Sequence, residues 1–547
     1  MSSSTDKPVS ARSSISEHTR VASLPQTPAP NNTIPSPLEA ATHIYHANHL
    51  ASESTLYLAA PDLTNSAGII NVDQSSEGTA RNLEERAPER PAENTEERPK
   101  QPPPPKLNYF QQRRNELKTA PWWVKFRLIF NTYRKLCITV AVFNALAIYF
   151  ASIGKFQYAA THPGAFIVGN LCVAVLVRNE CFLRLLFLII NTLFAKWSPI
   201  WVRTGISSVL QHLGGIHSGC ASSGLAWMIW RTVQIVRLSG WSGPALNAFG
   251  IITCTTLGIT FFAGWPVVRN RAHNFFERWH RFLGWTSLVM TWVFSMIATQ
   301  FNTMTLRWEF NPMAVPEAQE FWFVLVMTFC IVLPWTMTRR VPIEIEIPKK
   351  KTVAVIKFRR GMQQGLLGRI SHHAVWEYHL FGLISVSPKA DCHYMICGVQ
   401  GDFTRSLVER RPTHIWTREL KLPHVSHTSK LYHKGLRVCT GTGIGSGLST
   451  CMQSPNWFLI WIGSDFRNTF GDTIVDLMEN NVGEERRIIW DSKARKARPN
   501  VVQLIKETYD SWGAEVVFIT SNYQGNMEMM EGCKQLGLPC YGTLWDF

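Results

Sequence analysis

The stretch GLRVCTGTGIG, residues 435–445, decides how the end of this chain is expected to fold. Its first six residues predict a buried strand, and glycines follow at alternate positions. Glycines between a strand and a helix let the backbone approach a pyrophosphate, and the helix N-terminus offers it free N–H groups. Tight packing alone also produces such loops. The surrounding pattern favours nucleotide binding, with these candidate residues: Gly441, Thr442, Gly443 and Gly445.

Strands and helices alternate around and after this loop. A helix is expected from about Leu448, and further elements over 457–462 (strand), 470–479 (helix), 487–490 (strand) and 515–520 (strand). This alternation predicts a parallel α/β unit. Ser464, Asp465 and Arg467 follow the second strand, where a ribose or its 2′-phosphate would be recognised. Because an acid and a base are both present, NADH and NADPH stay open as alternatives.

Short β-rich runs precede the α/β unit. They cover 353–358, 368–370, 376–385 and 393–397. Alternating apolar and polar residues at short spacing predict an antiparallel barrel. One of these runs contains the aromatic-histidine segment Trp376-Glu377-Tyr378-His379-Leu380-Phe381.

The region before the barrel predicts a polytopic helical membrane bundle. About six apolar segments approach or exceed the length that a bilayer requires. They are 136–154, 164–195, 205–230, 244–268, 282–300 and 321–338. Arg178, Asn179, Glu180 and Arg184 interrupt the second, which is either two short helices or one long helix with a buried polar pair. Basic flanks and an even number of spans predict that both termini are cytosolic, in a plasma membrane or endomembrane.

Four histidines near the ends of the third and fifth segments are candidate haem ligands. They are His212, His217, His273 and His280. No second pair of histidines follows about four turns further along either helix, so a single haem is the most that the pattern supports. The alternative is that these histidines form hydrogen bonds across a tightly packed interface of small residues.

Composition separates a tail from the rest of the chain. Residues 1–105 hold 14 of the 30 prolines and no Trp, Cys or Phe, which predicts a disordered tail. The resulting domains are 1–105 (tail), 106–345 (transmembrane), 346–433 (barrel) and 434–547 (nucleotide-binding).

The net charge of +16 is concentrated at membrane flanks, so lipid headgroups and not nucleic acid are the expected partner. The 12 cysteines lack paired CxxC spacing, which is typical of buried reduced thiols.

Three motifs in order resemble those of the ferric reductase and NADPH oxidase superfamily, whose soluble half is a ferredoxin-reductase-like module. The motifs are Tyr378-His379-Leu380-Phe381-Gly382 with Ser385, then Gly401-Asp402-Phe403-Thr404, then Gly441 to Gly447. The chain also resembles fungal TmpA-like integral membrane flavoproteins. Related membrane modules are fused to adenylate-forming enzymes.

The resemblance implies FAD and NAD(P)H as cofactors, together with an electron acceptor that it does not identify. The implied flavin-binding residues are Tyr378, His379, Phe381, Ser385, Gly401, Thr404 and Phe547. Gly382 replaces the hydroxyl residue expected at flavin N5, and Leu448 replaces the proline that usually ends the loop. Thr520-Ser521-Asn522 replaces a Cys-Gly step beside the nicotinamide.

These features support two main hypotheses. The first is a membrane oxidoreductase that passes electrons from NAD(P)H through FAD to a membrane-associated acceptor, with a role in fungal development (conidiation) or secondary metabolism. The second is a non-enzymatic nucleotide-binding sensor or scaffold derived from such a reductase. A transporter or channel ranks third, because no inverted repeat is visible and the soluble region would have no role.

Overall fold

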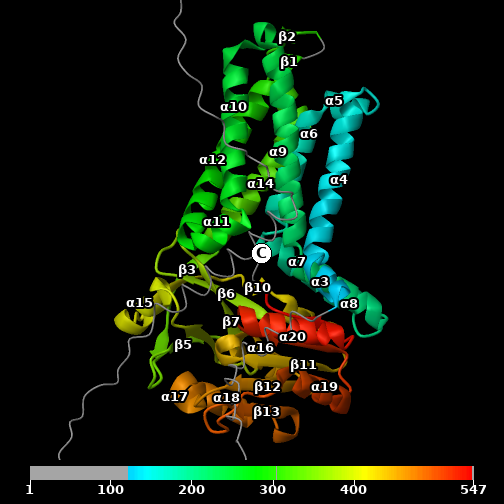
Figure 1. Ribbon diagram of the computed structural model, residues 1–547. Coiled ribbons are helices and arrows are strands. Elements are labelled where there is room, and N and C mark those ends of the chain that lie inside the picture. Colours follow the sequence, from blue (N-terminus) through cyan, green and yellow to red (C-terminus); the bar gives the residue numbers. More distant parts are fainter. Residues whose placement is uncertain (1–120, 303–304, 545–547) are drawn as a thin grey trace, which may run out of the picture. The chain divides into compact units, whose positions relative to one another are not determined.

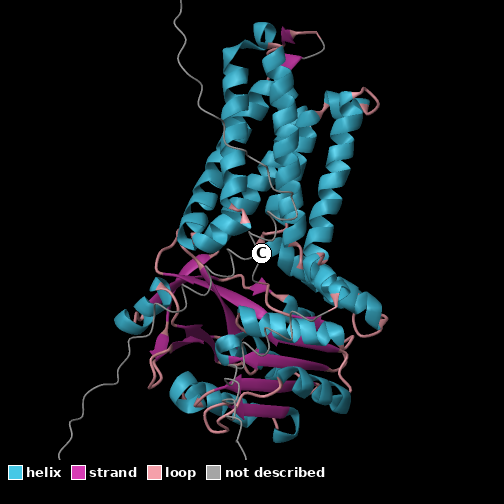
Figure 2. Ribbon diagram, viewed as in Figure 1, coloured by secondary structure: helices cyan, strands magenta, loops and turns pink. Residues whose placement is uncertain are grey.

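The computed structural model describes residues 121–302 and 305–544 (Figures 1 and 2). The predicted tail and Phe547 lie outside the described residues. The described residues all belong to one compact unit.

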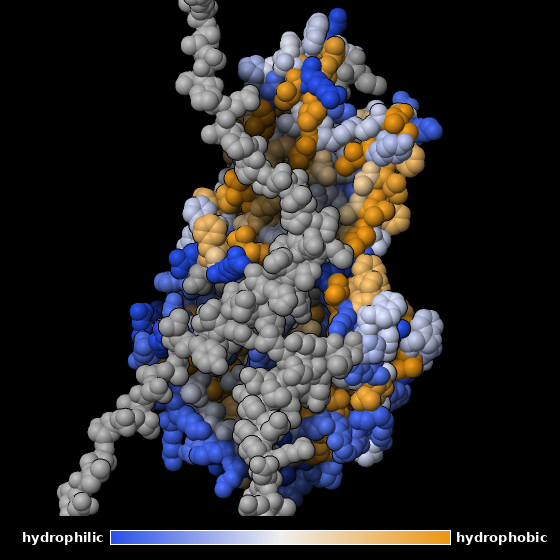
Figure 3. All heavy atoms as spheres, in the orientation of Figure 1, coloured by the Kyte–Doolittle hydropathy of each residue, from blue (hydrophilic) through white to orange (hydrophobic). Residues whose placement is uncertain are grey.

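Four of the described helices are long and apolar enough to cross a membrane. They are α4 (Thr132–Ser152), α10 (Ser239–Ala263), α12 (His273–Thr299) and α14 (Gln319–Thr336). They run beside α6 (Pro163–Leu176) and α9 (Gly214–Arg237) (Figure 1). Large apolar side chains are exposed along α4, including Phe143 at 69% (Figure 3). Such a surface suits contact with lipid.

The second and third predicted spans are each divided into two helices. Residues 164–195 contain the 14-residue α6 and then α7 (Glu180–Leu193). Asn179 separates them, because its side chain accepts hydrogen bonds from the backbone N–H groups of Cys181 and Phe182, both at 3.0 Å. Residues 205–230 contain the end of α8 (Ile200–Gln211) and most of α9. The number of six spans is therefore not reproduced by the helices themselves.

Helices α7 and α8 pack against the soluble region. The ring of Phe187 on α7 lies 6.1 Å from that of His427. On α8, Ser207 bonds the hydroxyl of Tyr432 at 2.9 Å, and the Thr204 carbonyl accepts from Tyr541 at 2.5 Å. The apolar residues of α7, α8 and the turn between them therefore form two groups. One group contacts the soluble region, and the other, which includes Trp197 and Trp201, is exposed.

A bidentate ion pair links Arg203 on α8 to Glu515. Two guanidinium N–H groups donate to the two carboxylate oxygens at 2.8 and 3.0 Å, and Arg203 is 5% exposed. Burial raises the pKa of Glu515. Hydrogen bonds from Arg203 and from the His433 N–H lower it by a larger amount, so the pKa lies below the ordinary value of 4.5.

We expect Arg203→Met to destabilise the protein by about 2–4 kcal/mol, because Glu515 keeps its charge and loses its main partner. The measurement is the melting temperature in detergent. A carboxylate with a lowered pKa stabilises the fold above its unfolded pKa and loses that contribution as pH falls through its folded pKa. The difference between wild type and variant should therefore be full at pH 7 and shrink below about pH 4.5. An equal difference at pH 7 and pH 3.5 would contradict this account.

The first soluble layer is an antiparallel sheet that nearly closes into a barrel. Its order is β3-β9-β6-β7-β8-β5-β4, and β10 (Leu422–Pro423) pairs with β6. The strands are β3 (Thr338–Pro342), β4 (Glu344–Glu346), β5 (Val353–Arg359), β6 (Leu366–Ser371), β7 (His379–Ile384), β8 (Cys392–Gly398) and β9 (His414–Arg418). The two edge strands are consecutive in the chain, which brings the edges near one another. The barrel predicted from alternation is confirmed.

The second soluble layer is a five-stranded parallel sheet in the order β13-β12-β11-β14-β15. Its strands are β11 (Gly435–Thr440), β12 (Trp457–Gly463), β13 (Arg487–Asp491), β14 (Val516–Thr520) and β15 (Cys540–Tyr541). Crossover helices α16 (Ile444–Gln453), α18 (Asp472–Asn481), α19 (Val501–Trp512) and α20 (Tyr523–Gln535) connect or flank them. The predicted parallel α/β unit is confirmed, and β11 is its central strand.

Candidate functional site

The candidate site lies where β11 ends at the carboxyl edge of the parallel sheet. Residues Gly441–Gly443 form a single 3₁₀ turn, and α16 begins at Ile444. Gly441 has φ +53°, a left-handed conformation that favours glycine, and a Cβ there would meet nothing within 4 Å. The indole N–H of Trp461 donates to its carbonyl at 3.0 Å and fixes the turn. The carboxyl edge beside a central strand is where open α/β sheets bind ligands.

Two of the following glycines are required by close packing. A Cβ on Gly443 would lie 2.4 Å from the Thr520 carbonyl oxygen, and one on Gly447 would lie 2.5 Å from the Cys439 sulfur. Gly445 is less crowded, with Ile396 at 3.7 Å. Packing therefore accounts for part of the glycine pattern, and the open side of the loop is at Gly441.

The first turn of α16 suits an anion. No side chain caps this end, and no acidic residue lies in the turn. Uncapped N–H groups at a helix N-terminus carry partial positive charge and bind phosphate readily. The hydroxyl of Ser446 in this turn bonds that of Thr520 at 3.0 Å.

The residues expected to recognise a ribose are engaged with other side chains. Asp465 accepts from Lys493 at 2.9 Å and from Asn468 at 2.7 Å, and Lys350 lies at 3.1 Å. These bonds lower the pKa of Asp465 well below its usual range. Arg467 pairs with three carboxylates, on Asp472, Asp476 and Glu479. These contacts of Asp465 and Arg467 therefore do not distinguish between NADH and NADPH.

The aromatic-histidine strand has contacts within the chain at every predicted flavin position. Tyr378 is 8% exposed, donates its hydroxyl to the Ala374 carbonyl at 2.7 Å, and lies 4.8 Å from the Arg418 guanidinium. The His379 ring stacks on Phe403 at 4.0 Å, and Phe381 lies further from the same ring at 6.5 Å.

The remaining predicted flavin residues also bond to nearby backbone. Ser385 accepts from the Met362 N–H at 3.0 Å and donates to the Ser387 carbonyl at 2.9 Å. Thr404 accepts from the Gly401 N–H at 3.2 Å and closes the start of α15 (Asp402–Arg410). These bonds give both hydroxyls a structural role in the present arrangement.

Strand β7 touches the glycine loop directly through Gly382. A Cβ there would lie 2.5 Å from the Gly445 carbonyl carbon and oxygen and 2.6 Å from the Ser446 Cα. Ser449 strengthens the contact, since it donates to the Leu383 carbonyl at 2.7 Å and accepts from the Ser385 N–H at 2.8 Å. A flavin ring does not fit between β7 and α16 while these backbones are in contact.

Three of the four candidate histidines bond a backbone carbonyl through Nδ1, and in two of them the carbonyl belongs to another helix. His217 on α9 donates Nδ1–H to the Ala174 carbonyl at 2.8 Å, and His280 on α12 donates to the Thr260 carbonyl at 3.0 Å. This tautomer leaves the lone pair on Nε2, as in most metal-bound histidines. His212 bonds Ser208 on its own helix, and the His273 side chain lies outside the described residues.

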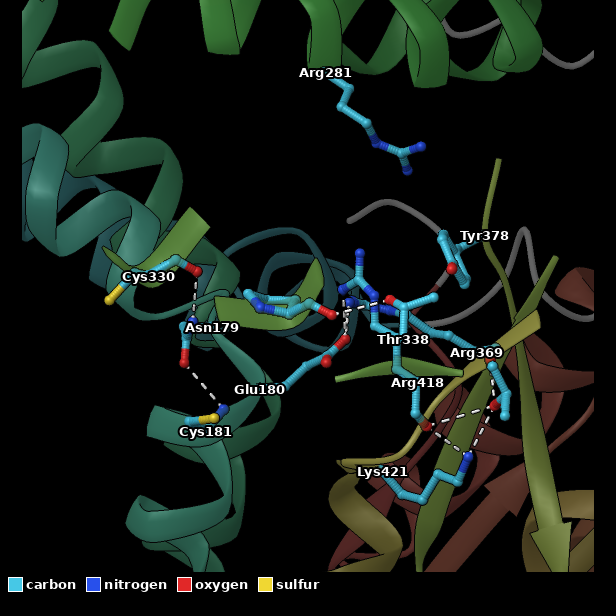
Figure 4. Close-up of polar contacts among 12 residues, drawn as sticks. Asn179, Glu180, Cys181, Arg281, Cys330, Thr338, Arg369, Tyr378, Arg418 and Lys421 are labelled. Carbon is cyan, nitrogen blue, oxygen red and sulfur yellow. Dashed lines mark hydrogen bonds and ion pairs between the residues drawn. The ribbon is translucent and has the colours of Figure 1, made fainter. Parts of the chain in front are cut away.

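A buried ion cluster joins α7 to the barrel (Figure 4). Glu180, with a side chain 3% exposed, bonds Arg369 on β6 and Arg418 on β9, the latter at 2.8 Å. Lys421 donates to the Thr417 hydroxyl at 2.9 Å, and burial lowers its pKa to about 8. The interruption at Glu180 was visible in the sequence. Its partners were not, because they lie 189 and 238 residues away.

Sequence comparisons find similarity to named reductases over most of the chain. A family described as "Adenylate-forming reductase 03009, C-terminal domain" matches residues 425–547. Adenylate-forming reductases 03009 and 06235 of Coprinopsis cinerea are each 28% identical, over 434 and 436 residues respectively. Each match covers 76% of this chain and 40% of the relative, so the chain spans well under half the length of either protein.

Among solved structures, the chain is similar to phthalate dioxygenase reductase, with 10% identity and a TM-score of 0.30 over 38% of this chain and 67% of that one. It is also similar to the ferredoxin reductase of carbazole 1,9a-dioxygenase, with 11% identity and a TM-score of 0.28 over 38% and 69%. The fold assignment for this chain comes from its own strands and helices.

Proposed function

We propose that this chain is a membrane-associated, nicotinamide-nucleotide-dependent reductase module. NAD(P)H binds at Gly441–Ser446 and supplies reducing equivalents to an acceptor at the membrane. One observation carries the proposal: the central parallel strand β11 ends in an open, positive-φ glycine followed by a helix start that lacks both a cap and an acid.

The similarity to adenylate-forming reductases supports the reductase class, since it covers most of the chain and includes residues 425–547. Four membrane-length helices support a location at a bilayer, with lipids as partners. We extend the proposal to a fungal role in development or secondary metabolism, as in TmpA-like flavoproteins, and to cytosolic termini.

A flavin in this module would have to meet a structural condition. Its predicted ligands are Tyr378, His379, Phe381, Ser385, Gly401 and Thr404. Because Gly382 touches Gly445 and Ser446, β7 and α16 must separate before a ring can lie between them. The assignment of these residues to FAD stays a prediction, and it requires a movement between the barrel and the parallel sheet.

The deciding experiment uses the full chain purified in mild detergent. We expect NADH or NADPH to bind, and a dye acceptor to be reduced at their expense. Gly443→Glu should abolish both, since it adds a charge like that of phosphate where a Cβ already meets the Thr520 carbonyl at 2.4 Å. Absence of nucleotide binding by the wild type would overturn the proposed function.

We propose in addition that His217 on α9 and His280 on α12 would hold one haem. A haem would supply single-electron transfer at this point of the chain. What the protein contributes is the fixed Nδ1–H tautomer of both rings, set by the carbonyls of Ala174 and Thr260.

The haem proposal predicts a Soret band in the visible spectrum of the purified protein. His217→Ala and His280→Ala should each reduce that band by at least about tenfold, because metal binding needs both imidazoles. His212→Ala serves as the matched control and should keep the band, since both proposed ligands, His217 and His280, are retained. A wild-type spectrum without a Soret band, in protein that still binds nucleotide, would remove haem from the proposal.

A sensor or scaffold is the second candidate function, and one observation favours it. The direct contact of Gly382 with Gly445 and Ser446 closes the space where a flavin and a nicotinamide would meet. Under this alternative, NAD(P)H raises the melting temperature without any turnover of a dye acceptor. Turnover by the wild type that is lost in Gly443→Glu would exclude it.

A further inference from the structure

Arg437 is a buried cation without an ion-pair partner among the described residues. It lies in the middle of β11 and is 1% exposed. Its guanidinium donates to three hydroxyls: Ser426 Oγ at 3.0 Å, and Ser446 Oγ and Thr520 Oγ1, both at 3.3 Å. Burying a charge that no opposite charge compensates is costly. The Phe518 ring, whose centroid is 5.7 Å from the guanidinium carbon, offsets part of this cost, and an anion bound nearby would offset more.

The two outer hydroxyls carry the effect of Arg437 to the edge of the sheet. Ser446 lies in the first turn of α16, and Thr520 is the last residue of β14. Both are half-buried, and their oxygens are 3.0 Å apart. Each oxygen accepts a bond from the guanidinium, and Ser446 Oγ also donates to the Gly443 carbonyl at 3.3 Å. When Ser446 is the donor of the bond between the two hydroxyls, the Thr520 hydroxyl has a proton to donate elsewhere. Both hydroxyls are adjacent to the uncapped N–H groups of α16.

Arg437 is the charged member of this network. His424 contacts Ser426 at 3.1 Å, and burial together with the charge of Arg437 lowers its pKa to about 4, so it is neutral at pH 7. The charge therefore acts from beneath the glycine loop, in a low-dielectric interior where it is screened little by salt.

We propose that Arg437 is a positioning residue for the pyrophosphate of a dinucleotide bound at Gly441–Ser446. The Thr520 hydroxyl donates to a phosphate oxygen, and Arg437 acts through Thr520 and through Ser446, which bonds it. This inference rests on the proposed nucleotide-binding function. It adds the residues that hold the anion and the source of the positive charge.

If Arg437 had only a structural role, its removal would change stability and not nucleotide affinity. Without the guanidinium, Ser446 and Thr520 still bond each other, and Ser426 still contacts His424. Replacing Arg437 by an apolar side chain of similar length also removes the cost of burying an unpaired charge. Stability and binding should therefore separate in Arg437→Met: the melting temperature stays or rises, while the nucleotide binds more weakly.

The test uses the full chain in detergent, with ADP-ribose and NADH as probes in calorimetric titrations. ADP-ribose carries the pyrophosphate without the nicotinamide. We expect Arg437→Met to raise the Kd for both probes by at least about tenfold, and Thr520→Val to raise both by about threefold or more. Lys434→Met is the matched control. It removes a positive charge just before the start of β11, far from the glycine loop, where Lys434 lies over the Trp512 ring, and should leave both Kd values unchanged.

Each outcome separates this inference from the function on which it rests. Wild-type protein that binds neither probe overturns both. Wild-type binding with an unchanged Kd in Arg437→Met overturns the inference alone. A loss for NADH but not for ADP-ribose also overturns it, since the effect would then lie at the nicotinamide. If Arg437→Met does not fold, Thr520→Val decides: an unchanged Kd for ADP-ribose contradicts the proposal.

Discussion

Glu180→Gln should destabilise the protein by about 3–5 kcal/mol, because it removes the carboxylate that compensates two buried arginines. Glu180 is 2% exposed, and both partner side chains are largely covered, at 27% for Arg369 and 13% for Arg418. The amide keeps the shape of the side chain and removes its charge, so the loss measures electrostatics and not packing. A drop of at least about 5 °C in melting temperature is expected.

The melting temperature can be followed with a thiol-reactive dye, since all 12 cysteines are unpaired and several are buried. Glu344→Gln provides the matched control. It makes the same change in an exposed barrel pair with Lys357 at 2.8 Å, where the cost should stay below about 1 kcal/mol. Equal melting temperatures for the two variants would show that the Glu180 cluster contributes no more than a surface pair.

The elements of the soluble half could be predicted because their signals are local. The patterns in 353–358 and 393–397 predicted the strands observed as β5 and β8, and the pattern at 435–440 predicted β11. The helices before Met337 were harder to predict, because the hydrophobicity of a helix does not show whether protein or lipid covers its apolar face. Phe187 on α7 packs against His427, although it lies within a segment predicted to face lipid. Composition alone does not separate a helix that contacts protein from one that contacts a bilayer.

The candidate site was predictable as a loop but not as a network. The glycines of 441–447 are adjacent in the sequence, so spacing was enough to single them out. Arg437 is part of the same stretch, and a lone arginine in a buried strand was the available signal. Its partners Ser426, Ser446 and Thr520 come from three separate elements, and only the folded sheet brings them together.

Gly382→Ser tests most directly how the barrel and the glycine loop are related. A reductase of the resembled type carries a hydroxyl residue here, close to flavin N5. In this chain a Cβ would meet the Gly445 backbone at 2.5 Å and the Ser446 Cα at 2.6 Å. Backbone atoms cannot move aside as a flexible side chain can, so we expect a loss of at least about 3 kcal/mol, at the upper end of overpacking costs. The melting temperature should fall by about 5 °C or more.

Gly205→Ala supplies the control for this substitution. Its Cβ meets nothing within 4 Å in the interior of α8, so the change should be neutral or stabilising by about 0.5–1 kcal/mol. The opposite result for Gly382→Ser would be equally informative. A serine that is tolerated, and that increases the flavin absorbance of the purified protein, would mean that β7 and α16 separate readily. The flavin-binding interpretation of Tyr378 and His379 would then gain support over the scaffold alternative, because the closed contact would be one of two arrangements.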